Sequence, residues 1–98
     1  IVVFTRGGQS ARRVAKERPR APIYAYASDD DVRRGLLLSW GVRPRHLPDG
    51  RSTDVVIRRV LADLRRNAHL RPGDRVVLVM GAAEDPAGAT SLIKLLTV

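Results

Sequence analysis

The chain has 98 residues, of which 44% are hydrophobic, so it can bury one modest core and form one domain. It contains no cysteine, which excludes disulfides, zinc–thiolate sites and thiol nucleophiles. The formal net charge is +8, and all but two of the cationic residues are arginines. Because the arginines are spread along the chain and no aromatic residues are interleaved with them, the composition argues against a nucleic acid as the main ligand.

No apolar stretch approaches the roughly 20 residues that cross a bilayer, and no signal segment is recognisable. We therefore expect no membrane partner and a cytoplasmic location. The chain opens directly inside an apolar run, residues 1–4, without a methionine or a polar leader. This start predicts that residues 1–98 are one domain cut from a longer protein.

The most informative segment is the first turn, which follows a short buried strand predicted at residues 1–4. The turn consists of Thr5, Arg6, Gly7, Gly8, Gln9 and Ser10. A strand that enters a helix through glycines gathers backbone N–H groups at the positive end of the helix dipole. The hydroxyls of Thr5 and Ser10 and the guanidinium of Arg6 can join them, and such donors hold phosphate groups. The alternative is an ordinary turn in which Ser10 only caps the helix.

The next segments alternate between helical and extended patterns. Apolar residues at helical spacing, Ala11, Val14 and Ala15, predict a first helix that ends at the prolines of residues 18–22. Residues 23–27 then predict a second strand.

A second helix is expected after that strand. Ser28 and the acidic residues 29–31 are expected to cap it, because carboxylates suit the positive end of the dipole; a divalent-cation site is the alternative. The helix is expected to stop at Gly41. Its predicted apolar side comprises Val32, Leu36 and Leu37, with Trp40 as a further candidate near the end of the helix.

Residues 42–47 predict a weak third strand, which Pro44 places at an edge of the sheet. The longest helix is expected near residues 52–68, where Asp63 is set against the neighbouring Arg59 and Arg66.

A Pro-Gly turn at residues 70–74 leads to the strongest predicted strand, residues 75–80, which is apolar enough to be buried on both faces. A glycine-bounded loop at residues 81–91 separates it from a last strand at residues 92–98.

This order of elements predicts an α/β fold: a three-layer sandwich around an open, five-stranded, mostly parallel sheet whose last strand is antiparallel. Ligands of such sheets collect outside the carboxyl ends of the strands. If the first and fourth strands are neighbours, the loop at 81–91 faces the turn at 5–10, and Gly88 and Thr90 can contact the same phosphorylated ligand. The alternative for this loop is a plain hairpin connection.

Residues suited to catalysis are few. His46 lies between prolines, and His69 is expected at a helix end, where it suits the dipole. No histidines have the spacing of metal ligands, and neither a nucleophile elbow nor a phosphate-binding loop with lysine is present. The sequence therefore predicts a binding site, with no catalytic residues and no metal ligands in this chain.

Taken in order, the motifs resemble the C-terminal domain of pyruvate kinase over essentially the whole chain. The matching segments are residues 1–10, 18–23 (RPRAPI), 34–44 (RGLLLSWGVRP), 72–77 (PGDRVV) and 90–98 (TSLIKLLTV). The resemblance implies a pyruvate kinase C-terminal-like regulatory and oligomerisation domain. It also implies that the first turn binds the phosphate of an effector, a sugar phosphate such as fructose 1,6-bisphosphate or AMP.

For the parent protein the resemblance implies phosphoryl transfer from phosphoenolpyruvate to ADP in separate domains, with Mg²⁺ and K⁺, and assembly as a homo-oligomer, a tetramer. The chain alone is expected to be non-catalytic. Two positions depart from the family pattern, because Gly7 replaces a serine and Gln9 stands where a larger or cationic residue is common. The helices that precede the first strand in the family are also missing.

Two other functions stay open at this point. One is a stand-alone α/β domain that binds a phosphate ligand or a partner without an attached kinase. The other is a basic nucleic-acid-binding module, for which binding to any duplex should weaken steeply with salt.

Overall fold

The computed structural model describes residues 1–48, 50–68, 70–80 and 92–98. Within this part the strands form one five-stranded sheet in the order β3-β2-β1-β4-β5. The first four strands are parallel, and β5 runs antiparallel to β4. The elements are β1 (Val2–Phe4), α1 (Gln9–Lys16), β2 (Ile23–Ala27), α2 (Asp30–Leu36), β3 (Val42–His46), α3 (Thr53–Asn67), β4 (Arg75–Met80) and β5 (Leu92–Thr97).

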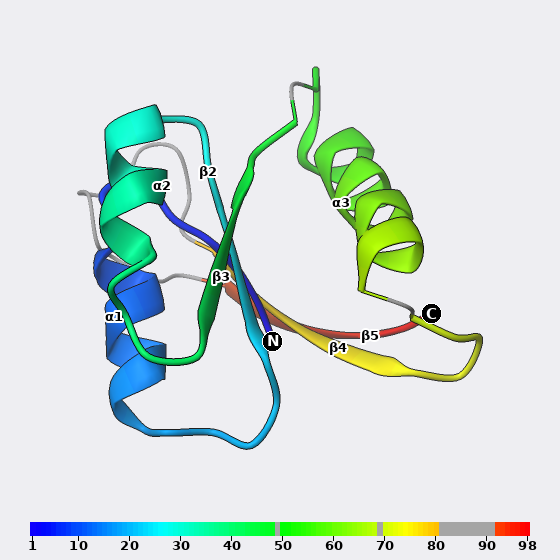
Figure 1. The fold of residues 1–98 in the computed structure, drawn as a ribbon. Helices are drawn as coiled ribbons and strands as arrows, with labels where there is room; N and C mark the ends of the chain where they lie inside the picture. Colours follow the sequence, from blue (N-terminus) through cyan, green and yellow to red (C-terminus); the bar gives the residue numbers. More distant parts are fainter. Residues whose placement is uncertain (49, 69, 81–91) are drawn as a thin grey trace.

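Helices cover both faces of this sheet. α1 and α2 lie on one face and α3 lies on the other, which gives the three layers that the sequence predicts (Figure 1). The expected α/β fold with an antiparallel last strand is therefore confirmed. None of the helices in the described residues is long and apolar enough to cross a membrane.

The two faces of the sheet are buried by alternate residues of the strands. On the α1 and α2 face the buried cluster comprises Val3, Ala11, Ala15, Ile23, Ala25, Leu36, Val42 and Val79. On the α3 face it comprises Val2, Tyr26, Val60, Leu64, Val76 and Leu78.

The caps of α2 and α3 follow the sequence closely. Asp29 Oδ1 accepts hydrogen bonds from the N–H groups of Asp31 (2.8 Å) and Val32 (3.1 Å), so Asp29 caps α2, and Ser28, also expected to cap, lies one residue before the capping position. At α3, the hydroxyl of Ser52 accepts from the N–H of Val55 at 3.3 Å. The helix therefore begins at Thr53, within the predicted segment.

The end of α2 differs from the sequence expectation. Leu36 is fully buried, but Leu37 is 69% exposed and Trp40 is 53% exposed, so these two residues are not on the buried side. The cause is a change of helical period, because Leu38 and Ser39 donate to the carbonyls three residues before them, of Gly35 and Leu36. A tighter turn rotates the following side chains away from the apolar stripe.

The fourth strand is also less buried than expected. Val77 is 37% exposed, and in the neighbouring strand Ile93 and Leu95 are 70% and 61% exposed. α1 packs on β1 and β2, and α2 packs on β2 and β3. Within the described residues these helices therefore leave Val77, Ile93 and Leu95 largely uncovered, although Val79 of β4 is buried.

The two edges of the sheet are β3 and β5. Pro44 lies in the middle of β3, as predicted for an edge strand. Leu47 donates to Ala27 of β2 at 3.0 Å, whereas Val42 donates to Ser39 outside the sheet at 3.3 Å. Because N–H groups alternate sides along a strand, Pro44 stands at an outward position of this edge.

Candidate functional site

The first turn lies where the strand order reverses. From β1 the chain goes to β2 and β3 on one side, and β4 then returns to the other side of β1. The condition set from the sequence, that the first and fourth strands are neighbours, is therefore met. The carboxyl ends of β1 and β4 flank this reversal, which is the usual place for a ligand in an open α/β sheet.

Thr5 and Gly8 fix the path of the turn. The N–H of Thr5 donates to the carbonyl of Tyr26 on β2 at 3.0 Å, and the Oγ1 of Thr5 accepts from the N–H of Gly8 at 2.9 Å. Thr5 is 8% exposed, and since its hydroxyl oxygen is the acceptor here, its hydroxyl hydrogen can be donated to a ligand. Gly8 has a φ of 89°, which favours glycine.

The N-terminus of α1 carries no side-chain cap within the described part of the chain. Gly8 occupies the capping position, and Ser10, 7% exposed, lies inside the helix. The capping role that the alternative gives to Ser10 is therefore wrong. The first turn of α1 contains no acidic residue, whereas those of α2 and α3 do. The positive end of the α1 dipole thus has no carboxylate in its own first turn to offset it.

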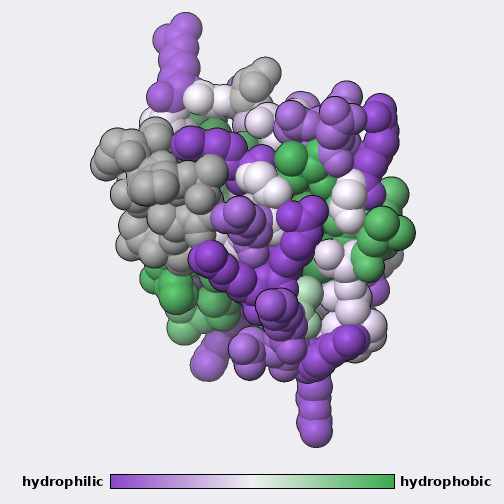
Figure 2. All heavy atoms as spheres, turned by 90° about the vertical axis from the view of Figure 1, so that its left-hand side faces the viewer, coloured by the Kyte–Doolittle hydropathy of each residue, from purple (hydrophilic) through white to green (hydrophobic). Residues whose placement is uncertain are grey.

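Arg12 reaches back to the turn and adds a cation that sequence reasoning missed. Its Nη1 donates to the carbonyl of Gly7 at 3.3 Å, and a Cβ added at Gly8 would lie 3.1 Å from the same nitrogen. The sequence does contain a signal for this contact. Arg12 lies four residues after Gly8, the capping residue of α1, and residues four apart are neighbours on a helix surface. Around it, the face formed by α1 and α2 is mostly hydrophilic, with hydrophobic atoms at its margins (Figure 2).

The predicted site residues fall into two groups. Thr5, Arg6, Gly7 and Gly8 form the turn itself, and Gln9 and Ser10 begin α1 directly after it. Gly88 and Thr90 lie outside the described residues. Arg6, Gly7 and Gln9 are exposed, and a Cβ at Gly7 would meet no atom within 4 Å.

A second polar cluster lies on the α3 face and was not foreseen. Asp63 Oδ2 accepts from the Tyr26 hydroxyl at 2.6 Å, and the two Asp63 oxygens accept from Arg45 Nε and Nη2 at 2.5 and 2.8 Å. Asn67 Nδ2 donates to Oδ1 at 2.9 Å. We call Tyr26, Arg45, Asp63 and Asn67 the Asp63 cluster.

The Asp63 cluster is electrostatically self-contained. The hydrogen bond from Arg45 holds the pKa of Asp63 below its ordinary value, and burial together with the bond to Asp63 raises the pKa of Tyr26. From the sequence, Asp63 was expected to interact with Arg59 and Arg66 of the same helix. In the structure the carboxylate of Asp63 is instead bonded to Tyr26 of β2 and Arg45 of β3. This cluster ties α3 to the sheet and leaves no reactive group.

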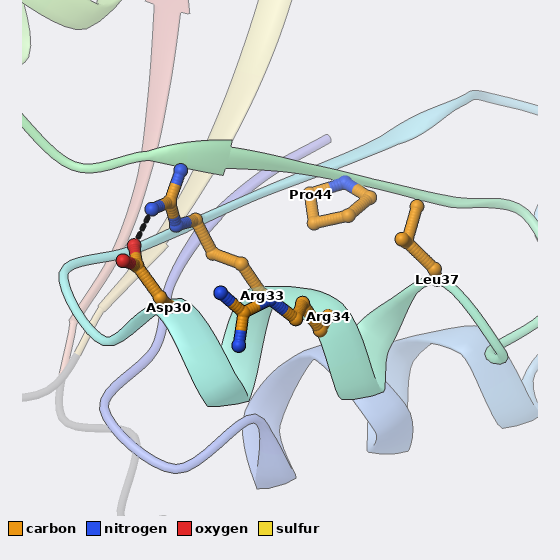
Figure 3. Close-up of a pocket in the computed structure, with 5 residues that line it drawn as sticks. All are labelled: Asp30, Arg33, Arg34, Leu37 and Pro44. Carbon is orange, nitrogen blue, oxygen red and sulfur yellow. Dashed lines mark ion pairs between the residues drawn. The ribbon is translucent and has the colours of Figure 1, made fainter.

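A shallow groove of about 330 Å³ separates α2 from β3, lined by Asp30, Arg33, Arg34, Leu37 and Pro44 (Figure 3). Arg33 pairs with Asp30, and Arg34 pairs with Asp31 at 3.0 Å. Because its arginines are already neutralised, this groove has less to offer an anion than the first turn. Within the described residues no group of histidine and acidic side chains could hold a metal ion.

Comparisons with known proteins agree with the fold. Residues 1–96 match the family described as "Pyruvate kinase, alpha/beta domain". "Pyruvate kinase 2" of Synechocystis sp. is 40% identical over 94 residues, which are 96% of this chain and 16% of that protein. "Pyruvate kinase" of Mycobacterium tuberculosis is 37% identical over 93 residues, 95% of this chain and 20% of that protein. The chain thus spans one fifth or less of the length of these relatives. It belongs to the pyruvate kinase family, as the alpha/beta domain that lies at the C-terminus of those proteins.

Proposed function

We propose that this chain is the regulatory domain of a pyruvate kinase and that its first turn binds the phosphate group of a small effector, a sugar phosphate or AMP. The observation that supports this most is the N-terminus of α1, which has no side-chain cap and no acidic residue and lies at the reversal of strand order. Backbone N–H groups and a positive dipole end are the general means by which proteins bind phosphate.

The side chains of the turn suit the same ligand. The Thr5 hydroxyl can donate its hydrogen while its oxygen accepts from Gly8. Arg6 and Arg12 bring guanidinium groups to the turn, and guanidinium binds phosphate through two parallel hydrogen bonds. Gly88 and Thr90 would contact the remainder of the effector, since their segment follows β4, the neighbour of β1.

The rest of the proposal concerns the parent protein. Its reaction would be phosphoryl transfer from phosphoenolpyruvate to ADP, carried out with Mg²⁺ and K⁺ by domains outside this chain. The relatives named pyruvate kinase support this reaction, and the chain would act on it from a distance. A cytoplasmic homo-oligomer, with the tetramer as the expected form, completes the proposal.

Amide chemical-shift mapping of the purified protein tests the site. Fructose 1,6-bisphosphate, AMP, ribose 5-phosphate and inorganic phosphate are titrated separately, and we expect the first shifts in residues 5–10, followed by Gly88 and Thr90. Shifts that cluster on α3 instead would show that the site is misassigned.

Arg6→Glu is the matching variant, because it places a carboxylate where the phosphate would bind. Affinity should fall at least tenfold, while Arg20→Glu, an equal charge change in an exposed loop after α1, should leave it within about twofold. Thermal unfolding of both variants should stay within about 0.5 kcal/mol of the parent chain. Equal binding by the two variants would contradict the proposal.

A further inference from the structure

The outer side of α3 carries several exposed arginines. Among the described residues, α3 is the one helix on its face of the sheet (Figure 1), and its inner side buries Val60 and Leu64. Residues seven apart on a helix differ by only about 20° in direction, so they form rows along it. One row consists of Arg58 and Arg65, and a second row consists of Arg59 and Arg66; all four are exposed. Arg51, also exposed, lies before the helix.

The four arginines of α3 outnumber its two acidic residues, Asp54 in the first turn and Asp63. Within the described residues Arg58, Arg65 and Arg66 form no ion pair. Asp63, the central acidic residue of α3, is engaged by Arg45 of β3.

The second helix shows the opposite arrangement. There each arginine is paired with an aspartate three residues earlier, Arg33 with Asp30 and Arg34 with Asp31. An arginine-rich composition alone would not distinguish the two helices. Arg58, Arg65 and Arg66 are therefore available to an external anion, whereas Arg33 and Arg34 are already paired.

We propose that the outer side of α3 binds the phosphate backbone of duplex nucleic acid, without reading its sequence. The two rows present guanidinium groups about 10 Å apart along each row, and guanidinium binds phosphate through two hydrogen bonds. Across the whole chain the arginines are spread out, as the sequence indicates, but the helical period gathers Arg58, Arg59, Arg65 and Arg66 on the outer side of α3.

The composition of the same side favours a duplex over other anionic partners. Its exposed positions between residues 53 and 67 include no aromatic side chain, on which the bases of a single strand would stack. They also include no large apolar side chain, on which the energy of most protein interfaces depends. A regular array of positive charges, without aromatic or large apolar side chains between them, matches the dense phosphates of a duplex.

Fluorescence anisotropy with DNA and RNA duplexes of about 20 base pairs, at salt concentrations from about 50 to 300 mM, provides the test. The variant is Arg58→Glu with Arg65→Glu, and the matched control is Lys16→Glu with Arg20→Glu, which changes the net charge equally on the other side of the sheet. We expect the α3 pair to lose at least tenfold in affinity and about two units of the slope of log K against log salt. The control should lose less than threefold.

A third variant separates charge from geometry. Arg58→Lys with Arg65→Lys keeps the charge, so the salt slope should persist while the affinity falls a few-fold. If the glutamate pair fails to fold, the lysine pair still tests the proposal. An unchanged affinity together with an unchanged salt slope in the lysine pair would then overturn it. Equal losses in the two glutamate pairs would overturn it, as would tighter binding to polyglutamate or to phosphatidylserine vesicles than to a duplex.

Discussion

At Gly8 the backbone takes a φ of 89° while Arg12 and Leu36 approach its Cα from the side. A Cβ there would lie 3.3 Å from Leu36 Cδ2, so the position is restricted both by conformation and by space. We expect Gly8→Ala to lower the free energy of unfolding by about 1 to 2 kcal/mol. Gly7→Ala is the control, because a Cβ at Gly7 meets nothing within 4 Å, and urea denaturation compares the two. Equal losses would show that the turn is not restricted at Gly8.

Gly7 also offers a way to strengthen the site. The pyruvate kinase C-terminal domain that the sequence resembles has a serine at this position, and the open space around Gly7 can accept one. Gly7→Ser should add one hydroxyl donor and tighten phosphate binding by about 1 kcal/mol, close to fivefold. Isothermal titration with the ligand that binds in the mapping experiment measures the change. If Gly7→Ala tightens binding as much as Gly7→Ser does, the hydroxyl is not the cause.

At the scale of elements, α3 is joined to the sheet by the Asp63 cluster, and two tyrosines of β2 provide a matched comparison. The Tyr26 hydroxyl donates to Asp63 of α3, whereas the Tyr24 hydroxyl accepts from Arg43 of the adjacent strand at 3.2 Å. Tyr26→Phe should cost about 1 to 2 kcal/mol in unfolding free energy, because it removes a bond to a charged group. Tyr24→Phe should cost about 0.5 kcal/mol or less. Chemical denaturation that ranks them in reverse would mean that the cluster does not hold α3.

The same cluster makes stability depend on pH. The pKa of Asp63 is lowered in the folded state, so its contribution is fully present above the ordinary aspartate value near 4 and is lost as the pH falls through the lower, folded value. Asp63→Asn should therefore be clearly less stable than the parent chain at pH 7. Below about pH 4 the two melting curves should converge. A gap that stays constant from neutral to acidic pH would contradict the charged role of Asp63.

The elements themselves were predictable because apolar periodicity and caps are local signals. Asp29 caps α2, and Pro44 lies in an edge strand, both as the sequence indicates. Leu37 and Trp40 were misplaced because the helical period tightens after Leu36, which an extrapolated period cannot reveal. The partner of Asp63 was missed because Arg45 is 18 residues away in sequence and reaches it only through the packing of β3 against α3.

The candidate site was predictable in its position but less so in its details. The strand and glycine pattern located the turn at residues 5–10, and the reversal of strand order places it where ligands of such sheets bind. The bond between Gly8 and Thr5 and the return of Arg12 to Gly7 depend on side-chain packing, which a linear pattern does not contain.

For the molecule as a whole, the described residues include no group of histidine and acidic side chains that could hold a metal ion, and the chain covers one fifth or less of the two relatives compared above. We expect the 98-residue chain alone to produce no pyruvate from phosphoenolpyruvate and ADP with Mg²⁺ and K⁺ present. A coupled lactate dehydrogenase assay measures this, with an intact pyruvate kinase as the positive control. Turnover above the blank would require catalytic residues in this domain.

The proline of β3 has a consequence for how copies of this sheet can join. Pro44 has no N–H group, so β3 lacks its central donor on the outer side. The N–H of Val42 is engaged by Ser39, which leaves that of His46 as the outward donor of β3 for another strand. β5 has no proline, and since Val98 donates inward to Asp74, the N–H groups of residues 93, 95 and 97 face outward. Sheet-to-sheet growth through strand pairing can therefore proceed from one side only. Two copies that meet through β5 form a continuous sheet with a blocked strand at each end, so this route closes after a pair and does not extend into a fibre.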